Sequence, residues 1–246
     1  MLTNKFKINY SIGAVANGIK TDTFTFFLLF FYSNIIGLNP ALAGSAIFIA
    51  LCVDAVTDPL MGTISDRTNS SYGRRHPFMM ISFIPMSLGY IFLFAPRQDW
   101  DMSQSDLFIW MTIFTVITRI GMTLFDIPHR AFGGEVTKNY KERTILMSWR
   151  EMFGWVAGLS NAFLGYGVFF ASTSEYPQGQ LNPDAWFPFA VTGAIFMIVS
   201  VLYSSLSTKD EIKSLSKWSG SISLLDIVNE LKIAIGNKSF LIFFFG

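Results

Sequence analysis

The sequence predicts an all-α membrane protein. Of the 246 residues, 51% are hydrophobic and only 14% are charged, and the mean hydropathy is +0.43, which is outside the usual range of soluble domains. Six apolar segments reach the roughly 20 residues that a helix needs to cross a bilayer. The net charge of +1 gives no basic excess for binding nucleic acid. No nucleophile, metal-ligand or phosphate-loop motif is visible, so the chain is not expected to be an enzyme.

The six predicted spans make up one bundle over residues 1–207. Lys5 and Lys7 precede the first span, but no small-residue cleavage site follows it, so this span is expected to stay in the membrane. A seventh apolar run covers 239–246 and is too short to cross, so we expect the chain to stop inside a seventh helix. The spans lie near residues 8–36, 41–64, 77–95, 107–134, 145–171 and 186–207.

The segment 208–238 is the one long polar stretch of the sequence. Leu224, Ile227, Val228 and Leu231 recur within it at helical spacing, with polar residues between them. This pattern favours an amphipathic helix on the cytoplasmic membrane face that links the bundle to the start of the seventh span. A solvated loop with incidental periodicity is the alternative.

Basic residues concentrate in alternate loops. They gather at the amino terminus, between spans two and three, between spans four and five, and after span six, whereas Arg97 is the one basic residue of the opposite loops. Positive residues near span ends are retained on the cytoplasmic side. Both ends of the six-span bundle are therefore predicted to be cytoplasmic.

The second span contains two carboxylates. Asp54 and Asp58 are four residues apart, so their side chains leave a helix on one face. Their repulsion is relieved if a hard cation such as Na+, or a proton, lies between them. Alternatively they pair with Arg119, Arg130 or Arg150 of neighbouring spans as structural ion pairs.

The fourth and first spans add further charge. Asp126 precedes Pro128, and a proline frees a backbone carbonyl for a neighbour or a ligand, although it can also serve packing alone. We expect Asp126 to pair with Arg119 or Arg150. Lys20 and Asp22 lie near the middle of the first span, which must therefore face the interior of the bundle.

Several other residues carry simpler expectations. Gly154 and Gly158 should allow another helix to approach closely. Cys52, the single cysteine, should be a small buried apolar residue, and His76 should be solvated at a loop end. His129 could relay protons or cap the kink at Pro128.

The loop after the second span holds an acid followed by several bases. An acid at a helix end next to a short basic loop can form ion pairs between helix ends that break when two bundles rock. Charge that only sets the topology would explain the arginines but not the acid. This candidate gating loop comprises Gly62, Asp66, Arg67, Gly73, Arg74 and Arg75.

In combination these motifs resemble the glycoside-pentoside-hexuronide:cation symporters of the major facilitator superfamily, the melibiose permease-like family. The shared motifs are Asp54-Ala-Val-Thr-Asp58-Pro59, the loop residues named above, and Asp126-Ile-Pro128, in the family's order and spacing. The resemblance extends from about Ile8 to Gly158.

The resemblance implies a twelve-span fold in which this chain is the N-terminal six-helix half and a C-terminal half completes the protein. It implies uptake of a sugar-type solute by alternating access, coupled to Na+, Li+ or H+, in the bacterial inner membrane and without another cofactor. The positions that hold the cation match Asp54, Asp58 and Thr123, and those that contact sugar match Asp126 and Arg150.

Two family positions differ in this chain. A sugar-binding acid in the first span aligns with Gly18, and Asp22, one turn later and close to Lys20, is a candidate substitute. A sugar-stacking tryptophan aligns with Arg130, which favours an anionic solute. We expect the hydroxyls or charge of the solute to be oriented by Lys20, Asp126, Arg130 and Arg150. A lipid or other organic-solute transporter, or a non-transporting truncated half, are the alternative functions.

Overall fold

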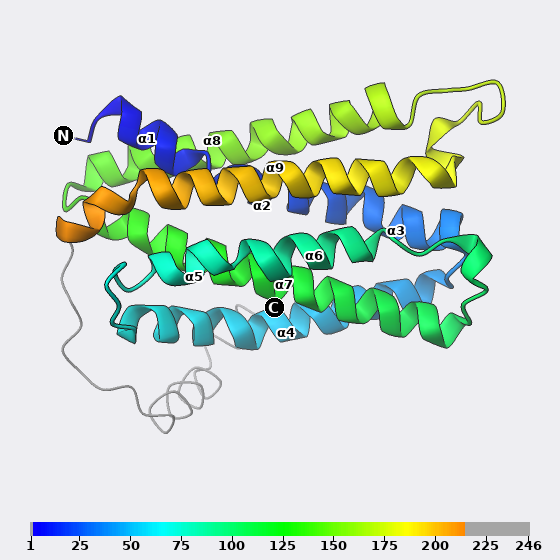
Figure 1. Ribbon diagram of the computed structural model, residues 1–246, viewed down its shortest axis with the longest axis horizontal. Helices are drawn as coiled ribbons and strands as arrows, with labels where there is room; N and C mark the ends of the chain where they lie inside the picture. Colours follow the sequence, from blue (N-terminus) through cyan, green and yellow to red (C-terminus); the bar gives the residue numbers. More distant parts are fainter. Residues whose placement is uncertain (1, 215–246) are drawn as a thin grey trace.

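The computed structural model describes residues 2–214, and within this range the chain is built of helices without strands. The long helices lie side by side along one axis, and the chain reverses direction at the two ends of the bundle (Figure 1). The predicted all-α fold is confirmed. One end, here called the basic end, carries the 68–75 loop and the 136–139 connection.

The first predicted span is not one continuous helix. It consists of α1 (Asn4–Ser11), α2 (Ala14–Asp22), a π-helical turn (Thr23–Phe27), α3 (Leu28–Phe30) and a second π-helical turn (Phe31–Ile36). The segment ends at Gly37, whose φ of 84° is a left-handed conformation that costs glycine little.

The other five predicted spans are confirmed as helices long and apolar enough to cross a membrane, at Pro40–Arg67, His76–Leu93, Gln104–Glu135, Tyr140–Phe169 and Pro183–Glu211. They contain α4 (Pro40–Arg67), α5 (His76–Ile81), α6 (Phe83–Leu93), α7 (Gln104–Glu135), α8 (Tyr140–Leu164) and α9 (Trp186–Ser207). A π-helical turn (Gly165–Phe169) extends α8. Short 3-10 turns lie at Gln98–Trp100, Gly179–Leu181, Pro183–Ala185 and Lys209–Ser214.

Helices α4 and α7 are parallel and keep one register along most of their length. The Asn39 amide donates to Gln104 Oε1 at 2.8 Å, Arg119 pairs with Asp54, and Thr123 donates to Asp58, and each pair is separated by 65 residues in the chain. A constant separation means that each turn of α4 meets the corresponding turn of α7. We call this series of paired residues the α4–α7 ladder.

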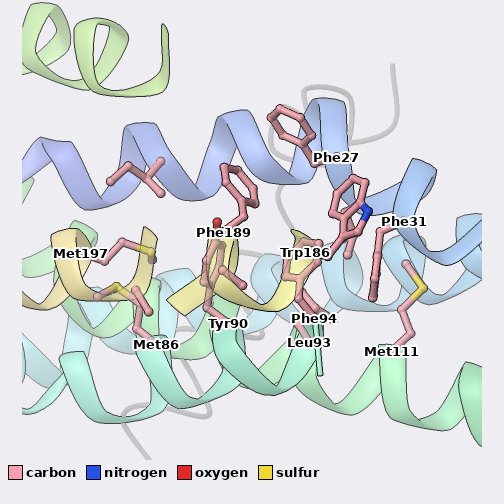
Figure 2. Packing of buried hydrophobic residues seen from close by; sticks show 14 of the residues in the cluster. Phe27, Phe31, Met86, Tyr90, Leu93, Phe94, Met111, Trp186, Phe189 and Met197 are labelled. Atoms are coloured by element: carbon pink, nitrogen blue, oxygen red, sulfur yellow. The ribbon is translucent and has the colours of Figure 1, made fainter. Parts of the chain in front are cut away.

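An aromatic core fills the interior of the bundle where α9 meets α6 and the first span (Figure 2). Trp186 is fully buried, and its ring lies 4.5 Å from that of Phe170 and 5.2 Å from that of Phe31, measured between centroids. Its indole nitrogen donates to the Gln180 carbonyl at 3.0 Å. Phe27, Phe30, Phe94 and Phe189 belong to the same group, so this end of α9 is fixed by large apolar contacts.

Helices α2 and α8 touch through glycine. A Cβ added at Gly18 would lie 2.1 Å from the Gly154 carbonyl oxygen, and one at Gly158 would lie 3.2 Å from the Gly18 carbonyl oxygen. The close approach predicted from Gly154 and Gly158 is therefore confirmed, with α2 as the partner.

Two simpler expectations were wrong. Cys52 is exposed, on the outward face of α4, because apolar character in a membrane helix does not distinguish the core from an outward face. His76 is buried, with its ring 4.8 Å from that of Phe132 and its Nε2 3.2 Å from Thr208 Oγ1. The polar cap that Thr208 provides makes this burial possible.

Most of the predicted linker and the start of the seventh span lie outside the described residues. Of the segment 208–238, the structure describes only 208–214, where Lys209–Ser214 forms a 3-10 turn. The domain boundaries at 207 and 238 therefore stay predictions.

Candidate functional site

A small cavity of about 80 Å³ opens between α2, α4 and α7. Its polar lining consists of three acids, two bases, one amide and one hydroxyl. These are Asp54, Asp58 and Asp126, Lys20 and Arg119, Asn17, and Thr123. The structure thus brings the three predicted cation-binding residues together with two of the predicted solute-binding residues, Lys20 and Asp126.

The two carboxylates of α4 have different partners on α7. Arg119 Nη1 donates to Asp54 Oδ2 in an ion pair. One turn further along the ladder, Thr123 Oγ1 donates to Asp58 Oδ1 at 2.7 Å. The structural pairing that the sequence left open therefore holds for Asp54, while Asp58 accepts from a neutral hydroxyl.

Among residues 2–214, two buried polar atoms of the residues that line this cavity have no hydrogen-bond partner. They are Asp54 Oδ1 and Arg119 Nε. Buried polar groups are normally satisfied, and an exception points to water, an ion or a functional role. The residues that line the cavity therefore have more hydrogen-bonding capacity than their contacts with one another use.

The two bases of the cavity share one aromatic ring. Lys20 Nζ lies 5.7 Å and the Arg119 guanidinium carbon 5.5 Å from the centroid of Phe24. A cation over a ring face is attracted by the ring's electron density. Phe24 thus holds positive charge on the α2 side of the cavity, facing the acids of α4.

Asp126 lies at the centre of an ion-pair network. Arg150, with 1% of its side chain exposed, donates through Nη2 to Asp126 Oδ1 and through Nη1 to Glu151 Oε1 at 2.5 Å. Arg130, half exposed, donates through Nε to Asp126 Oδ2 at 2.6 Å. The predicted pairing of Asp126 with Arg150 is confirmed, and Arg130 joins the same network.

His129 connects this network to the break between α1 and α2. Its ring is stacked on Tyr10 at 4.1 Å, and its Nε2 lies 3.0 Å from the Tyr10 carbonyl oxygen. Arg150 Nε donates to His129 Nδ1 at 3.4 Å. Because a guanidinium has no acceptor, Nδ1 accepts and Nε2 carries the hydrogen, so the contacts require a neutral imidazole. His129 therefore positions Arg150.

Asp22 is not brought into the cavity. It shares the face of Gly18, as predicted, but that face packs against α8. Asn161 Nδ2 donates to Asp22 Oδ2 at 3.2 Å and to Thr23 Oγ1 at 3.1 Å, and Thr23 lies 2.7 Å from the Tyr90 hydroxyl. Asp22 thus belongs to a buried polar cluster between α2, α6 and α8.

The candidate gating loop forms ion pairs at the basic end. Arg75 Nη2 lies 2.5 Å from Asp66 Oδ1 and 2.9 Å from Glu135 Oε1. Arg74 Nη2 lies 2.9 Å from Glu135 Oε2, and Gly73 turns the loop with a φ of 78°. The predicted ion pairs between helix ends are confirmed.

An acid outside the candidate gating loop takes part in these ion pairs, and two residues of the loop, Arg67 and Gly62, lie within α4. Glu135, which pairs with Arg74 and Arg75, was missed by sequence reasoning, because the sequence does not show that α4 and α7 end side by side. Arg67 is the last residue of α4. Gly62 lies within α4, where an added Cβ would be 3.8 Å from Ile127, and so belongs to the ladder.

Comparison with known proteins gives the family. The sequence pattern of the family described as "MFS/sugar transport protein" matches residues 9–246. The chain belongs to this family. The resemblance to glycoside-pentoside-hexuronide:cation symporters is thereby confirmed, and the all-α fold is that of the N-terminal half of a major facilitator. It is an integral membrane protein from a family of transporters.

Three relatives illustrate the range of the family. The "Uncharacterized symporter sll1374" of Synechocystis is 32% identical over 84% of this chain and 38% of its own length. The "Isoprimeverose transporter" of Lactiplantibacillus pentosus is 22% identical over 85% and 42%. The "Sodium-dependent lysophosphatidylcholine symporter 1-A" of Danio rerio is 30% identical over 64% and 30%. This chain thus spans less than half the length of each.

Proposed function

We propose that this chain forms the N-terminal half of a twelve-helix symporter that takes up a sugar or sugar acid together with a cation. The observation that carries the proposal is that the carboxylate pair of α4 and the Asp126 network of α7 open on one cavity. Two ligands bound there would contact the same helices. The names of the three relatives support symport or transport in general.

The proposed cation ligands are Asp54, Asp58 and Thr123. Hard cations favour oxygen ligands, and these three side chains supply carboxylate and hydroxyl oxygens on facing turns of the ladder. We propose Na+ as the coupling ion, with Li+ and H+ as alternatives.

The proposed solute ligands are Lys20, Asp126, Arg130 and Arg150. A carboxylate accepts from sugar hydroxyls, and a guanidinium binds a carboxylate or sulfate through paired hydrogen bonds. Arg130 is half exposed and can change partners, whereas Arg150 is held in place. This set favours an anionic sugar. Asp22 is left out because it faces α8.

The proposed mechanism is alternating access. Each ligand favours the same conformation of α2, α4 and α7, and the C-terminal half supplies the other wall of the cavity. The ion pairs of Asp66, Arg74, Arg75 and Glu135 open and close at the basic end, which we place on the cytoplasmic side of the bacterial inner membrane.

The test is uptake into proteoliposomes that contain the complete protein. Labelled neutral sugars and glucuronides are offered under a Na+, Li+ or proton gradient. We expect one gradient to drive accumulation and the Asp54→Asn/Asp58→Asn variant to lose that stimulation. The Asp99→Asn/Asp101→Asn variant, which alters two exposed acids outside the cavity, should keep it. Stimulation retained by the first variant would contradict the proposal.

A second candidate is transport of a lipid-like solute. The name of the zebrafish relative favours it. Accumulation of solutes that carry an acyl chain, without accumulation of free sugars, would support this function. If no solute accumulates under any gradient, the non-transporting alternative gains support.

A further inference from the structure

Two arginines face the carboxylates of the site, Arg150 buried and Arg119 partly buried, and they are held differently. Arg150 has three polar partners, Asp126, Glu151 and His129. Among the described residues, Arg119 has one polar partner, Asp54 Oδ2, and its Nε is buried without an acceptor. The rest of its support is the face of Phe24. Arg150 is thus anchored, whereas Arg119 is held by contacts that can be exchanged.

We infer that Arg119 sets the affinity of the cation site, as a tethered counter-ion that competes with the mobile cation for Asp54. This inference rests on the proposed function, because it concerns the same carboxylate pair. It assigns a regulatory contact to a residue that the sequence offered only as a structural partner.

The register of the ladder supports the inference. Asp54 and Asp58 lie one turn apart on α4, and Arg119 and Thr123 lie opposite them, one turn apart on α7. A cation that bridges the two carboxylates therefore binds next to the position of the guanidinium. Two positive charges in adjacent positions repel, so the ion pair of Arg119 with Asp54 opposes the binding of a cation to both acids.

The surroundings of Arg119 strengthen this competition. Only 12% of the side chain is exposed, so little water screens its charge. Lys20 lies over the same ring of Phe24 and adds a second positive charge nearby. Asp54 keeps one oxygen, Oδ1, without a partner among the described residues. The carboxylates are therefore partly neutralised by side chains of the protein itself, and a mobile cation that binds at Asp54 Oδ1 competes with them.

The consequence is a measurable change in cation affinity. Removing the charge at Arg119 should lower the Na+ concentration needed for half-saturation by about tenfold or more, a typical size for coupling between two sites. Arg119→Lys keeps the charge, so its affinity should stay near that of the unchanged protein. Arg119→Gln/Asp54→Asn removes one carboxylate as well, so the gain should disappear.

The experiment is thermal unfolding of the intact protein in detergent, titrated with NaCl at ionic strength held constant by choline chloride. The Arg119→Gln variant is purified in NaCl, because its Asp54 would otherwise be buried without a counter-charge. At saturating Na+ we expect the unfolding temperature of Arg119→Gln to lie about 5 °C or more above its value in choline chloride alone. A matched titration with the unchanged protein gives the reference half-saturation.

Several outcomes would overturn the inference. They are a half-saturation in Arg119→Gln within twofold of the unchanged protein, weaker binding in that variant, or equal gains in Arg119→Gln and Arg119→Lys. No Na+ response in either protein also overturns it, yet uptake driven by a proton gradient would still support symport. Conversely, a tenfold gain in Na+ binding without gradient-driven uptake would support Arg119 as a competitor and reject the proposed transport.

Discussion

The aromatic core around Trp186 and the charged cavity around Asp54 are built on opposite principles. In the apolar stretch of the Pro183–Glu211 segment, 50% of the residues are buried. In the apolar stretch of Pro40–Arg67, only 17% of the residues are buried. Helix α9 is enclosed by large apolar side chains, and α4 contributes one narrow polar face to the bundle. We infer that the core carries most of the stability and that the cavity is free to hold poorly satisfied charge.

The largest expected effect lies in the aromatic core. Trp186→Ala removes a fully buried indole and should cost about 3–5 kcal/mol of unfolding free energy. Thermal unfolding in detergent measures the loss. The matched control is Phe187→Ala, because Phe187 is its neighbour but is exposed. An equal loss of stability in both variants would contradict the claim that the aromatic core contributes more to stability than the outward face of α9.

A smaller effect is expected in the cavity. Arg150→Lys cannot reproduce the contacts to Asp126, Glu151 and His129, and it should cost about 2–3 kcal/mol because charged hydrogen bonds are lost in a buried place. Arg130→Lys should cost less than about 1 kcal/mol, since Arg130 is half exposed. Chemical denaturation of the two variants side by side tests the order. The reverse order would show that the network does not depend on Arg150.

A further effect, similar to that of Arg150→Lys or smaller, is expected at the contact of α2 with α8. Gly18→Ala places a methyl group against the Gly154 carbonyl oxygen and should destabilise the protein by about 1–3 kcal/mol. Gly154→Ala meets its nearest atom at 3.5 Å, an ordinary contact, and should change stability by less than about 1 kcal/mol. Thermal unfolding compares them, and similar values would mean that α2 and α8 can separate at little cost.

Much of the fold could be predicted from the sequence because hydropathy and loop charge report directly on membrane helices. Five spans are found where they were expected, and the spacing of Asp54 and Asp58 correctly placed both carboxylates on one face. The breaks in the first span were not predicted. Apolar residues continue through α3 and the π-helical turns, so hydropathy gives no sign of the change in winding.

The directions of individual side chains were harder to predict. Asp22 and Gly18 share a face, but which neighbour that face meets depends on helix packing rather than on the local sequence. Cys52 and His76 show the same limit, since one apolar residue faces outward and one polar residue is buried. Glu135 could be recognised as a partner only once α4 and α7 were known to end side by side.

The common direction of α4 and α7 also has an electrical consequence. Backbone dipoles add along a helix and leave partial negative charge at its C-terminal end. Because these two helices run in parallel, both negative poles lie together at the basic end, where they repel. Arg74 donates to the backbone carbonyl of Asp66 in the last turn of α4 at 3.2 Å and also pairs with Glu135, the last residue of α7. The loop arginine thus neutralises two helix ends at once, and any motion that withdraws it uncovers both poles.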